Sequence, residues 1–309
     1  MIISAPNQGK TNLIVELVKD IKMYNEPLKP RKAGMIPTVL LITMEDTEKD
    51  IMKRLFAIVT GRNIDEFGNK QAIVREMADH GFLFDEQHNI NIVVKYHEYR
   101  SISTDDIYTI VKEMEDCNQE VIGITLDYIK RIEPSVPDPK NEKGEIHRIC
   151  NELKTIANKL GVPVISGMQL NREAMNIIDT AKDKGQGDLA KKVGRAHISV
   201  AIEVQEVPDV CIIIDREDLI SIEESPYWPT WQTFKLIRHR YSSQHLVSGK
   251  TYFAHPFDKN MGIRYICDVD GEKVSRESLI TSLPQEDKKK SVKTDDDVLD
   301  YIEGRYEKL

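Results

Sequence analysis

The stretch Ser4-Ala5-Pro6-Asn7-Gln8-Gly9-Lys10-Thr11 decides the fold. It follows Met1-Ile2-Ile3, which are typical of a short strand, and it opens a stretch typical of a helix. Backbone N–H groups of such a loop wrap phosphate groups, and the N-terminus of the following helix adds positive potential. We therefore expect this loop to bind a nucleoside triphosphate.

Two side chains of the loop have specific expected roles. Lys10 is expected to reach the β- and γ-phosphates, and the Thr11 hydroxyl to hold Mg²⁺. The usual first glycine of the motif is replaced by Ser4. A Gly-Lys-Thr tripeptide also occurs by chance in ordinary turns, but the strand before it and the helix after it favour a phosphate loop.

Outward from the loop, short apolar runs alternate with amphipathic stretches. Strands are predicted at residues 39–43, 90–96, 121–126 and 162–168, and helices at residues 50–60, after a cap at Ser103, and at residues 145–160. This alternation predicts an α/β fold with a mostly parallel central sheet flanked by helices. Later runs predict a C-terminal antiparallel extension, at residues 210–214, 233–237, 251–254 and 263–267.

Three predicted strands end in polar side chains, namely Glu45, Asp127 and Gln169. Ligands of open α/β sheets bind at the carboxyl ends of strands, so we expect these side chains beside the phosphate loop. Asp127 is suited to the Mg²⁺ shell and Glu45 to polarising the attacking water, while Gln169 can hydrogen-bond the γ-phosphate. Taken singly, an acid at a strand end is more often a helix cap, a first-turn helix acid or a surface residue.

Composition limits the class of protein. The 309 residues are 40% hydrophobic and 30% charged, which fits a soluble globular protein. No apolar run approaches the roughly 20 residues of a membrane span, and no secretory signal is recognisable. The four cysteines are far apart and form no CxxC pair, which is typical of reduced thiols in a cytoplasmic protein. The net charge of −8 still allows a local basic path for DNA.

The order of these motifs resembles the motor domain of DnaB-type replicative DNA helicases, within the RecA-like group of P-loop NTPases. The run Gln169-Leu170-Asn171-Arg172 is the most specific piece. The resemblance spans about residues 1–257. It implies ATP or another NTP and Mg²⁺ as cofactors, single-stranded DNA as a partner, a homo-hexamer, contact with a primase or helicase loader, and the cytoplasm of a bacterial or phage-infected cell as the location.

The resemblance also implies roles residue by residue. Lys10 and Thr11 match the nucleotide-binding pair, with the rest of the loop around them. Glu45 matches the catalytic glutamate, Asp127 the aspartate on the Mg²⁺ side, and Gln169 the γ-phosphate sensor.

A basic strand end at residues 234–240 matches the segment that reaches into the neighbouring subunit's nucleotide. Arg238 stands where the family often has lysine, and Arg240 falls on the arginine-finger position. The alternative for this cluster is an exposed sheet edge, where charges deter aggregation.

Two stretches match the family's central DNA loops in location, residues 132–145 and 172–195. Their basic side chains can follow phosphates without reading sequence. The candidates are Lys140, Lys143, Arg172, Lys184, Lys191, Lys192 and Arg195. Each lysine taken alone is more often a solvated surface residue.

Two other functions share these motifs. A RecA-type recombinase or branch-migration ATPase has the same loop and acids, but the residues 169–172 and the basic loops favour the helicase. A nucleotide-binding assembly factor with little hydrolysis is suggested by the altered loop, although such a factor has no need of Glu45.

We expect a motor domain at residues 1–283 and a charged tail at residues 284–309. Because the phosphate loop starts almost at Met1, we expect a truncated chain or a minimal motor without an N-terminal domain. Trp228 and Trp231 have no assigned role; a subunit contact and a local cluster both fit them.

Overall fold

The computed structural model describes residues 1–6, 8–62, 69–82, 88–138, 140–170, 174–177, 180, 206–218, 230–240, 252–258 and 262–263. The strands are β1 (Ile2–Ser4), β2 (Ile36–Thr43), β3 (Asn91–Tyr96), β4 (Gln119–Asp127), β5 (Val164–Gln169), β6 (Val210–Asp218), β7 (Thr230–His239), β8 (Tyr252–Asp258) and β9 (Gly262–Ile263). The helices are α1 (Lys10–Tyr24), α2 (Glu48–Thr60), α3 (Lys70–Asp79), α4 (Thr104–Asp116) and α5 (Glu142–Leu160), with a short 3₁₀ helix η2 (Ile129–Arg131) after β4.

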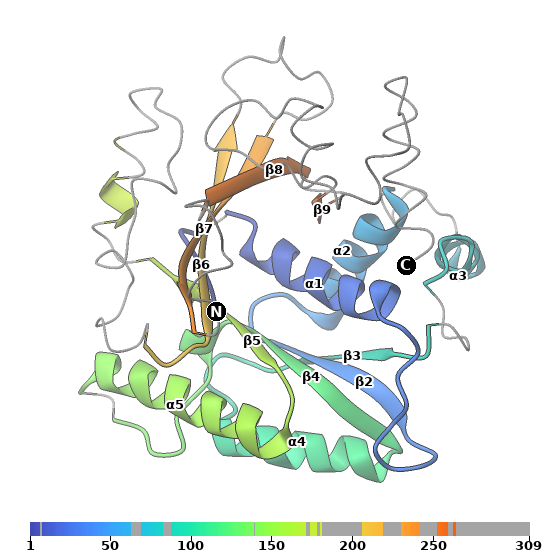
Figure 1. Cartoon of the computed structure of the whole chain (residues 1–309), viewed down its shortest axis with the longest axis horizontal. Helices are drawn as coiled ribbons and strands as arrows, with labels where there is room; N and C mark the ends of the chain where they lie inside the picture. Colours follow the sequence, from blue (N-terminus) through green and yellow to red (C-terminus); the bar gives the residue numbers. More distant parts are fainter. Residues whose placement is uncertain are drawn as a thin grey trace, which may run out of the picture.

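Within these residues the strands form one nine-stranded sheet in the order β3-β2-β4-β5-β1-β6-β7-β8-β9 (Figure 1). The pairings from β3 through β6 are parallel, and those from β6 through β9 are antiparallel. β1 lies between β5 and β6, so the loop that follows it emerges in the middle of the row of strand ends, at the side where the parallel strands end. The expected mostly parallel fold with an antiparallel extension is confirmed.

β6 differs in one respect from the expectation for residues 210–214. It pairs antiparallel with β7 but parallel with β1, through Ile2 opposite Ile212 and Ile3 opposite Ile213. The strand pattern of this run is the same for either kind of neighbour, so the sequence could not reveal that β6 completes the parallel part.

The sheet is covered on both faces, as the alternation of β2 shows. Val39 and Leu41 point into a core shared with α1 and α2, whereas Leu40 and Ile42 point into a core shared with α4 and α5. Figure 1 shows the two pairs of helices on opposite sides of the sheet. All four side chains are at most 1% exposed, and full burial of one such side chain contributes about 1.5–3 kcal/mol.

Helix ends follow local capping chemistry. Thr47 and Asp50 form a capping box at the start of α2, and α2 ends at Gly61 with φ 69°. At α4, Asp106 accepts hydrogen bonds from the Ser103 backbone N–H at 2.7 Å and from its hydroxyl at 2.8 Å, which confirms the predicted start. α5 begins three residues before its predicted start, because the Asn141 side chain caps it by accepting from the Gly144 N–H at 3.0 Å.

α3 was not predicted. Met77 is its one buried side chain and Val74 is 44% exposed, so this helix contributes little to the core. No helix in the described ranges has the length and apolar character that crossing a membrane requires.

Candidate nucleotide-binding site

The predicted phosphate loop joins the central strand to the first helix. β1 ends at Ser4 and α1 begins at Lys10, preceded by Gly9 in the left-handed region with φ 84°. Glycine adopts that conformation without steric cost, and it turns the chain sharply into the helix. Ala5 and Gln8 are buried, and Gln8 donates to the Pro6 carbonyl at 3.4 Å. Asn7 lies outside the described residues.

Lys10 is a buried cation whose stem crosses β5. A Cβ atom added to Gly167 would lie 2.6 Å from Lys10 Cδ and 2.8 Å from Cε, so the lysine in its present position requires a glycine there. The ammonium lies 4.3 Å from the centroid of the Tyr128 ring. Burial lowers the pKa of Lys10, and the nearby charges of Asp127 and Glu45 oppose that shift. Burial disfavours the charged form of Lys10, and an anion bound beside the ammonium would offset that cost.

Thr11 and Asp127 meet across the site. The Thr11 hydroxyl donates to Asp127 Oδ2 at 2.5 Å, and the Asp127 side chain is completely buried. Burial raises the pKa of this carboxyl, while the Thr11 hydrogen bond and Lys10 oppose the rise. Within the described ranges Asp127 Oδ1 has no hydrogen-bond partner. A buried carboxylate oxygen left in this way is suited to a cation and its water shell.

Glu45 lies next to this pair because β2 and β4 are in register. Thr43 is opposite Asp127, and the Met44 N–H donates to the Asp127 carbonyl at 3.1 Å. The Glu45 side chain is 46% exposed, and Arg131 Nη2 lies 3.6 Å from its Oε1. Glu45 is therefore open to solvent at the same edge as the phosphate loop.

The turn after Glu45 is fastened to α1 by a residue that the sequence did not single out. Arg54 Nε lies 2.9 Å from Asp46 Oδ2, and Arg54 Nη1 donates to Asn12 Oδ1 at 2.7 Å. This bridge joins the end of β2 to the helix that starts at Lys10.

Gln169 completes the edge. It is opposite Ser4 in the parallel pairing of β5 with β1, and the Leu170 N–H donates to the Ser4 carbonyl at 2.9 Å. The structure therefore brings Lys10, Thr11, Glu45, Asp127 and Gln169 to one edge of the sheet, as predicted.

The predicted basic strand end lies elsewhere. His239 is opposite Val210, the first residue of β6, so Arg240 lies at the edge where the parallel strands begin. Arg240 Nε is 3.2 Å from Asp209 Oδ1, and its Nη2 donates to the Glu206 and Val207 carbonyls at 3.1 and 3.2 Å. Arg238 is partly buried in β7. Within one chain neither arginine joins Lys10.

The candidate DNA-contacting residues are only partly within the described ranges. Lys140 is exposed before α5, and Lys143 is exposed in its first turn. Outside the described residues lie Arg172, Lys184, Lys191, Lys192, Arg195, Trp228 and the tail at 284–309. The side chain of Trp231 is likewise not described.

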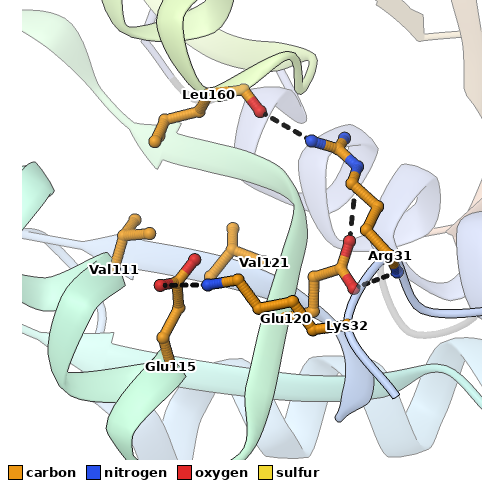
Figure 2. A pocket seen from close by; sticks show the side chains of 7 residues that line it. All are labelled: Arg31, Lys32, Val111, Glu115, Glu120, Val121 and Leu160. Atoms are coloured by element: carbon orange, nitrogen blue, oxygen red, sulfur yellow. Dashed lines mark hydrogen bonds and ion pairs between the residues drawn. The ribbon is translucent and has the colours of Figure 1, made fainter.

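A cavity of about 110 Å³ lies at the opposite edge of the sheet, beside the start of β4 (Figure 2). Its charged side chains are already paired: Arg31 Nε lies 3.3 Å from Glu120 Oε1, and Lys32 Nζ lies 3.0 Å from Glu115 Oε2. Arg31 Nη1 also donates to the Leu160 carbonyl at 3.1 Å, which caps the end of α5. These contacts hold the segment before β2 in place, and they occupy the charged side chains that line the cavity.

A phosphate loop on the central strand, with acids after the two strands β2 and β4, defines the class of RecA-like P-loop NTPases. A sequence model of one family in this class, the DnaB-like helicase C terminal domain, matches residues 1–257. The chain belongs to that family.

Curated relatives agree with this assignment. The replicative DNA helicase DnaB of Haemophilus influenzae is 28% identical over 230 residues, which cover 71% of this chain and 42% of that protein. The same helicase of Buchnera aphidicola is 27% identical over 184 residues, covering 56% of this chain and 34% of that protein. The chain thus spans less than half the length of these relatives.

Solved structures share the fold. One solved ATPase domain superposes with a TM-score of 0.60 at 18% identity, covering 87% of this chain and 84% of that one. A DnaB-like replicative helicase, whose structure describes its interactions with primase, superposes with a TM-score of 0.57 at 17% identity, covering 84% of this chain and 55% of that one. At these identities the likeness concerns the fold alone.

Proposed function

We propose that this chain is the NTP-hydrolysing motor of a replicative DNA helicase, which moves along single-stranded DNA and unwinds duplex DNA. The observation that supports this most directly is the Thr11–Asp127 hydrogen bond of 2.5 Å, with the second oxygen of the buried Asp127 left without a partner in the described chain. Family membership supplies the direction of the proposal, because the curated relatives named above are replicative helicases.

The residues present fit a magnesium nucleotide. Thr11 and Asp127 would hold the cation, while Lys10 and the loop from Ser4 to Gly9, through its backbone N–H groups other than at Pro6, would bind the phosphates. When bound, Mg²⁺ would supply neutralisation of the negative charge on the phosphate groups during hydrolysis. The unpartnered Asp127 Oδ1 and the buried Lys10 ammonium are the features of this chain that support the fit.

Two further side chains have proposed roles in turnover. Glu45 would orient the attacking water and accept its proton, because its carboxylate is exposed at the edge where Lys10 lies. Gln169, at the end of β5 beside the loop, would donate its amide to the γ-phosphate and relay its loss to the residues that follow.

The assembly is proposed to be a homo-hexamer with nucleotide between subunits. Arg240, with Arg238 beside it, would act on the neighbouring subunit's nucleotide, because the structure holds it away from Lys10 of its own chain. Such a finger is worth roughly 10³–10⁵ in rate. Contact with single-stranded DNA is proposed for both basic loops, and contact with a primase or loader for the assembled ring.

ATP hydrolysis with and without single-stranded DNA tests the chemical part of this proposal. The expected result is DNA-stimulated turnover that Lys10→Ala abolishes and Lys32→Ala, a matched surface change at the far edge, leaves intact. Tight ATP binding with negligible turnover on DNA would favour a nucleotide-binding assembly factor instead. Filaments rather than rings on single-stranded DNA, seen by electron microscopy, would favour a recombinase.

A further inference from the structure

Arg131 lies between the two acidic strand ends of the site. It is the last residue of η2, four positions after Asp127. Its Nη1 donates to the Met44 carbonyl at 3.3 Å, and its Nη2 lies 3.6 Å from Glu45 Oε1. Its Cζ is 5.2 Å from the centroid of the Tyr128 ring. One guanidinium therefore contacts the end of β2 and the residue that follows Asp127.

The backbone of Arg131 is itself held on both sides. Its N–H donates to the Tyr128 carbonyl at 3.0 Å, and its carbonyl accepts from the Arg100 N–H at 2.7 Å. Arg100 is anchored in turn, with Nη2 2.8 Å from Oε2 of the buried Glu145 and Nε 3.2 Å from Glu133 Oε1. The guanidinium that faces Glu45 thus projects from a braced segment.

The Glu45 side chain is held less firmly than Arg131. Its side chain is 46% exposed, against 26% for Arg131, and a glutamate this open samples several rotamers unless a partner fixes it. The planar fork of arginine can engage the Met44 carbonyl and the Glu45 carboxylate together, which a point charge cannot do. The face of Tyr128 fixes the plane of that fork, because it lies under the guanidinium.

We infer that Arg131 is a positioning residue, which holds the Glu45 carboxylate toward the phosphate site through the ion pair. This inference rests on the proposed function, in which Glu45 orients the attacking water. Arg131 acts through Glu45 and has no phosphate contact of its own. Its Nη1 and Nη2 already contact the Met44 carbonyl and the Glu45 carboxylate, and its face lies over the Tyr128 ring. Lys10, at 4.3 Å from the same ring, is the cation of the phosphate loop.

The test compares the unsubstituted chain with Arg131→Ala, Arg131→Lys, Glu45→Gln and the Arg131→Ala/Glu45→Gln double variant. The measurements are kcat and KM for ATP on single-stranded DNA, and the Kd values of fluorescent ATP and ADP analogues. Arg131→Ala is expected to lower kcat about 10- to 100-fold with KM and both Kd values within about twofold, because a misplaced catalytic group costs rate rather than binding. Arg131→Lys should recover part of the loss.

The double variant decides whether the effect passes through Glu45. In the Glu45→Gln background, Arg131→Ala should change the residual kcat by less than about twofold. Arg31→Ala is the matched control, because it removes an arginine paired with a carboxylate at the opposite edge of the sheet. It should leave kcat unchanged.

Two results would overturn the inference. Losses that multiply fully in the double variant would mean that Arg131 acts independently of Glu45. A Kd for the triphosphate analogue raised tenfold or more, with the diphosphate unaffected, would make Arg131 a phosphate ligand. If the unsubstituted chain does not hydrolyse ATP, the proposed function fails, and the pair is still tested by urea midpoints of the unsubstituted chain, Arg131→Ala, Glu45→Gln and the double variant. Non-additive midpoints support it, and additive midpoints reject it.

Discussion

Asp127 shows at the residue scale how a binding role and stability oppose each other. Its carboxyl is completely buried, and burial raises its pKa above the ordinary 3.8. A raised pKa means that the folded chain binds this proton more tightly than the unfolded chain does. The contribution of this proton to the free energy of unfolding is therefore fully present at low pH. It is lost as the pH rises through the pKa that Asp127 has in the folded chain. At neutral pH this carboxyl therefore supports the chain without bound nucleotide less than it does at low pH.

Asp127→Asn is expected to stabilise the apo chain while removing activity. At neutral pH its unfolding free energy should rise by on the order of 1 kcal/mol, because an uncharged amide costs less to bury. The gain should shrink as pH falls toward 3.8, the ordinary value at which the unfolded carboxyl becomes neutral. Urea denaturation across this pH range measures it. Asp105→Asn, at an exposed aspartate of α4, is the control without such a gain. An equal or lower stability of Asp127→Asn at neutral pH would contradict the burial cost.

At the scale of elements, β5 shapes the site through a residue that carries no side chain. β5 lies between β4 and β1, so the stem of Lys10 crosses it at Gly167. Glycine in a strand interior often marks a close approach of another group, and here the group is the phosphate-loop lysine.

Gly167→Ala is expected to weaken nucleotide binding without unfolding the chain. The added methyl would stand 2.6 Å from Lys10 Cδ, so the lysine would have to shift from its present position, in which the ammonium lies over Tyr128. A tenfold rise in the Kd for ATP, about 1.4 kcal/mol, is the expected size. Gly123→Ala in β4 is the matched control, since its methyl would meet Pro163 Cγ at an ordinary 3.7 Å. Equal effects of both substitutions on Kd would refute this account of β5.

The elements also show what the sequence could and could not predict. The phosphate loop, Glu45, Asp127 and Gln169 were predicted together, because parallel strands deliver their carboxyl ends to one edge. Gly167 was missed, since its contact with Lys10 depends on which strands are neighbours, and no local pattern encodes that order.

Arg131 and Arg54 were missed for the same reason. Each is an ordinary basic residue in the sequence. Glu45, the partner of Arg131, and Asn12, the partner of Arg54, each lie far from that arginine in the sequence. The parallel pairing of β6 with β1 likewise follows from tertiary context.

At the scale of the whole molecule, the separation of Lys10 from Arg240 implies that the proposed active site needs two subunits. Arg240 is fixed to Asp209 at the edge opposite the phosphate loop. A closed ring of head-to-tail interfaces would bring each Arg240 toward the next subunit's nucleotide.

Mixing two inactive variants tests this arrangement. Lys10→Ala lacks the lysine of the proposed nucleotide site, and Arg240→Ala lacks the proposed finger. In a random equal mixture about a quarter of the head-to-tail interfaces would combine an intact Lys10 with an intact Arg240. DNA-stimulated ATP hydrolysis should therefore reappear on mixing and subunit exchange. A mixture as inactive as its components, although shown by native mass spectrometry to form mixed rings, would mean that Arg240 does not act in trans.

The measurement that tests the central claim most directly is ATP-dependent strand displacement on a forked DNA duplex, with Lys10→Ala as the control. A helicase motor predicts displacement that requires ATP and disappears in the control. Displacement that persists without ATP or in Lys10→Ala would contradict the claim, as would its absence in rings that hydrolyse ATP on single-stranded DNA.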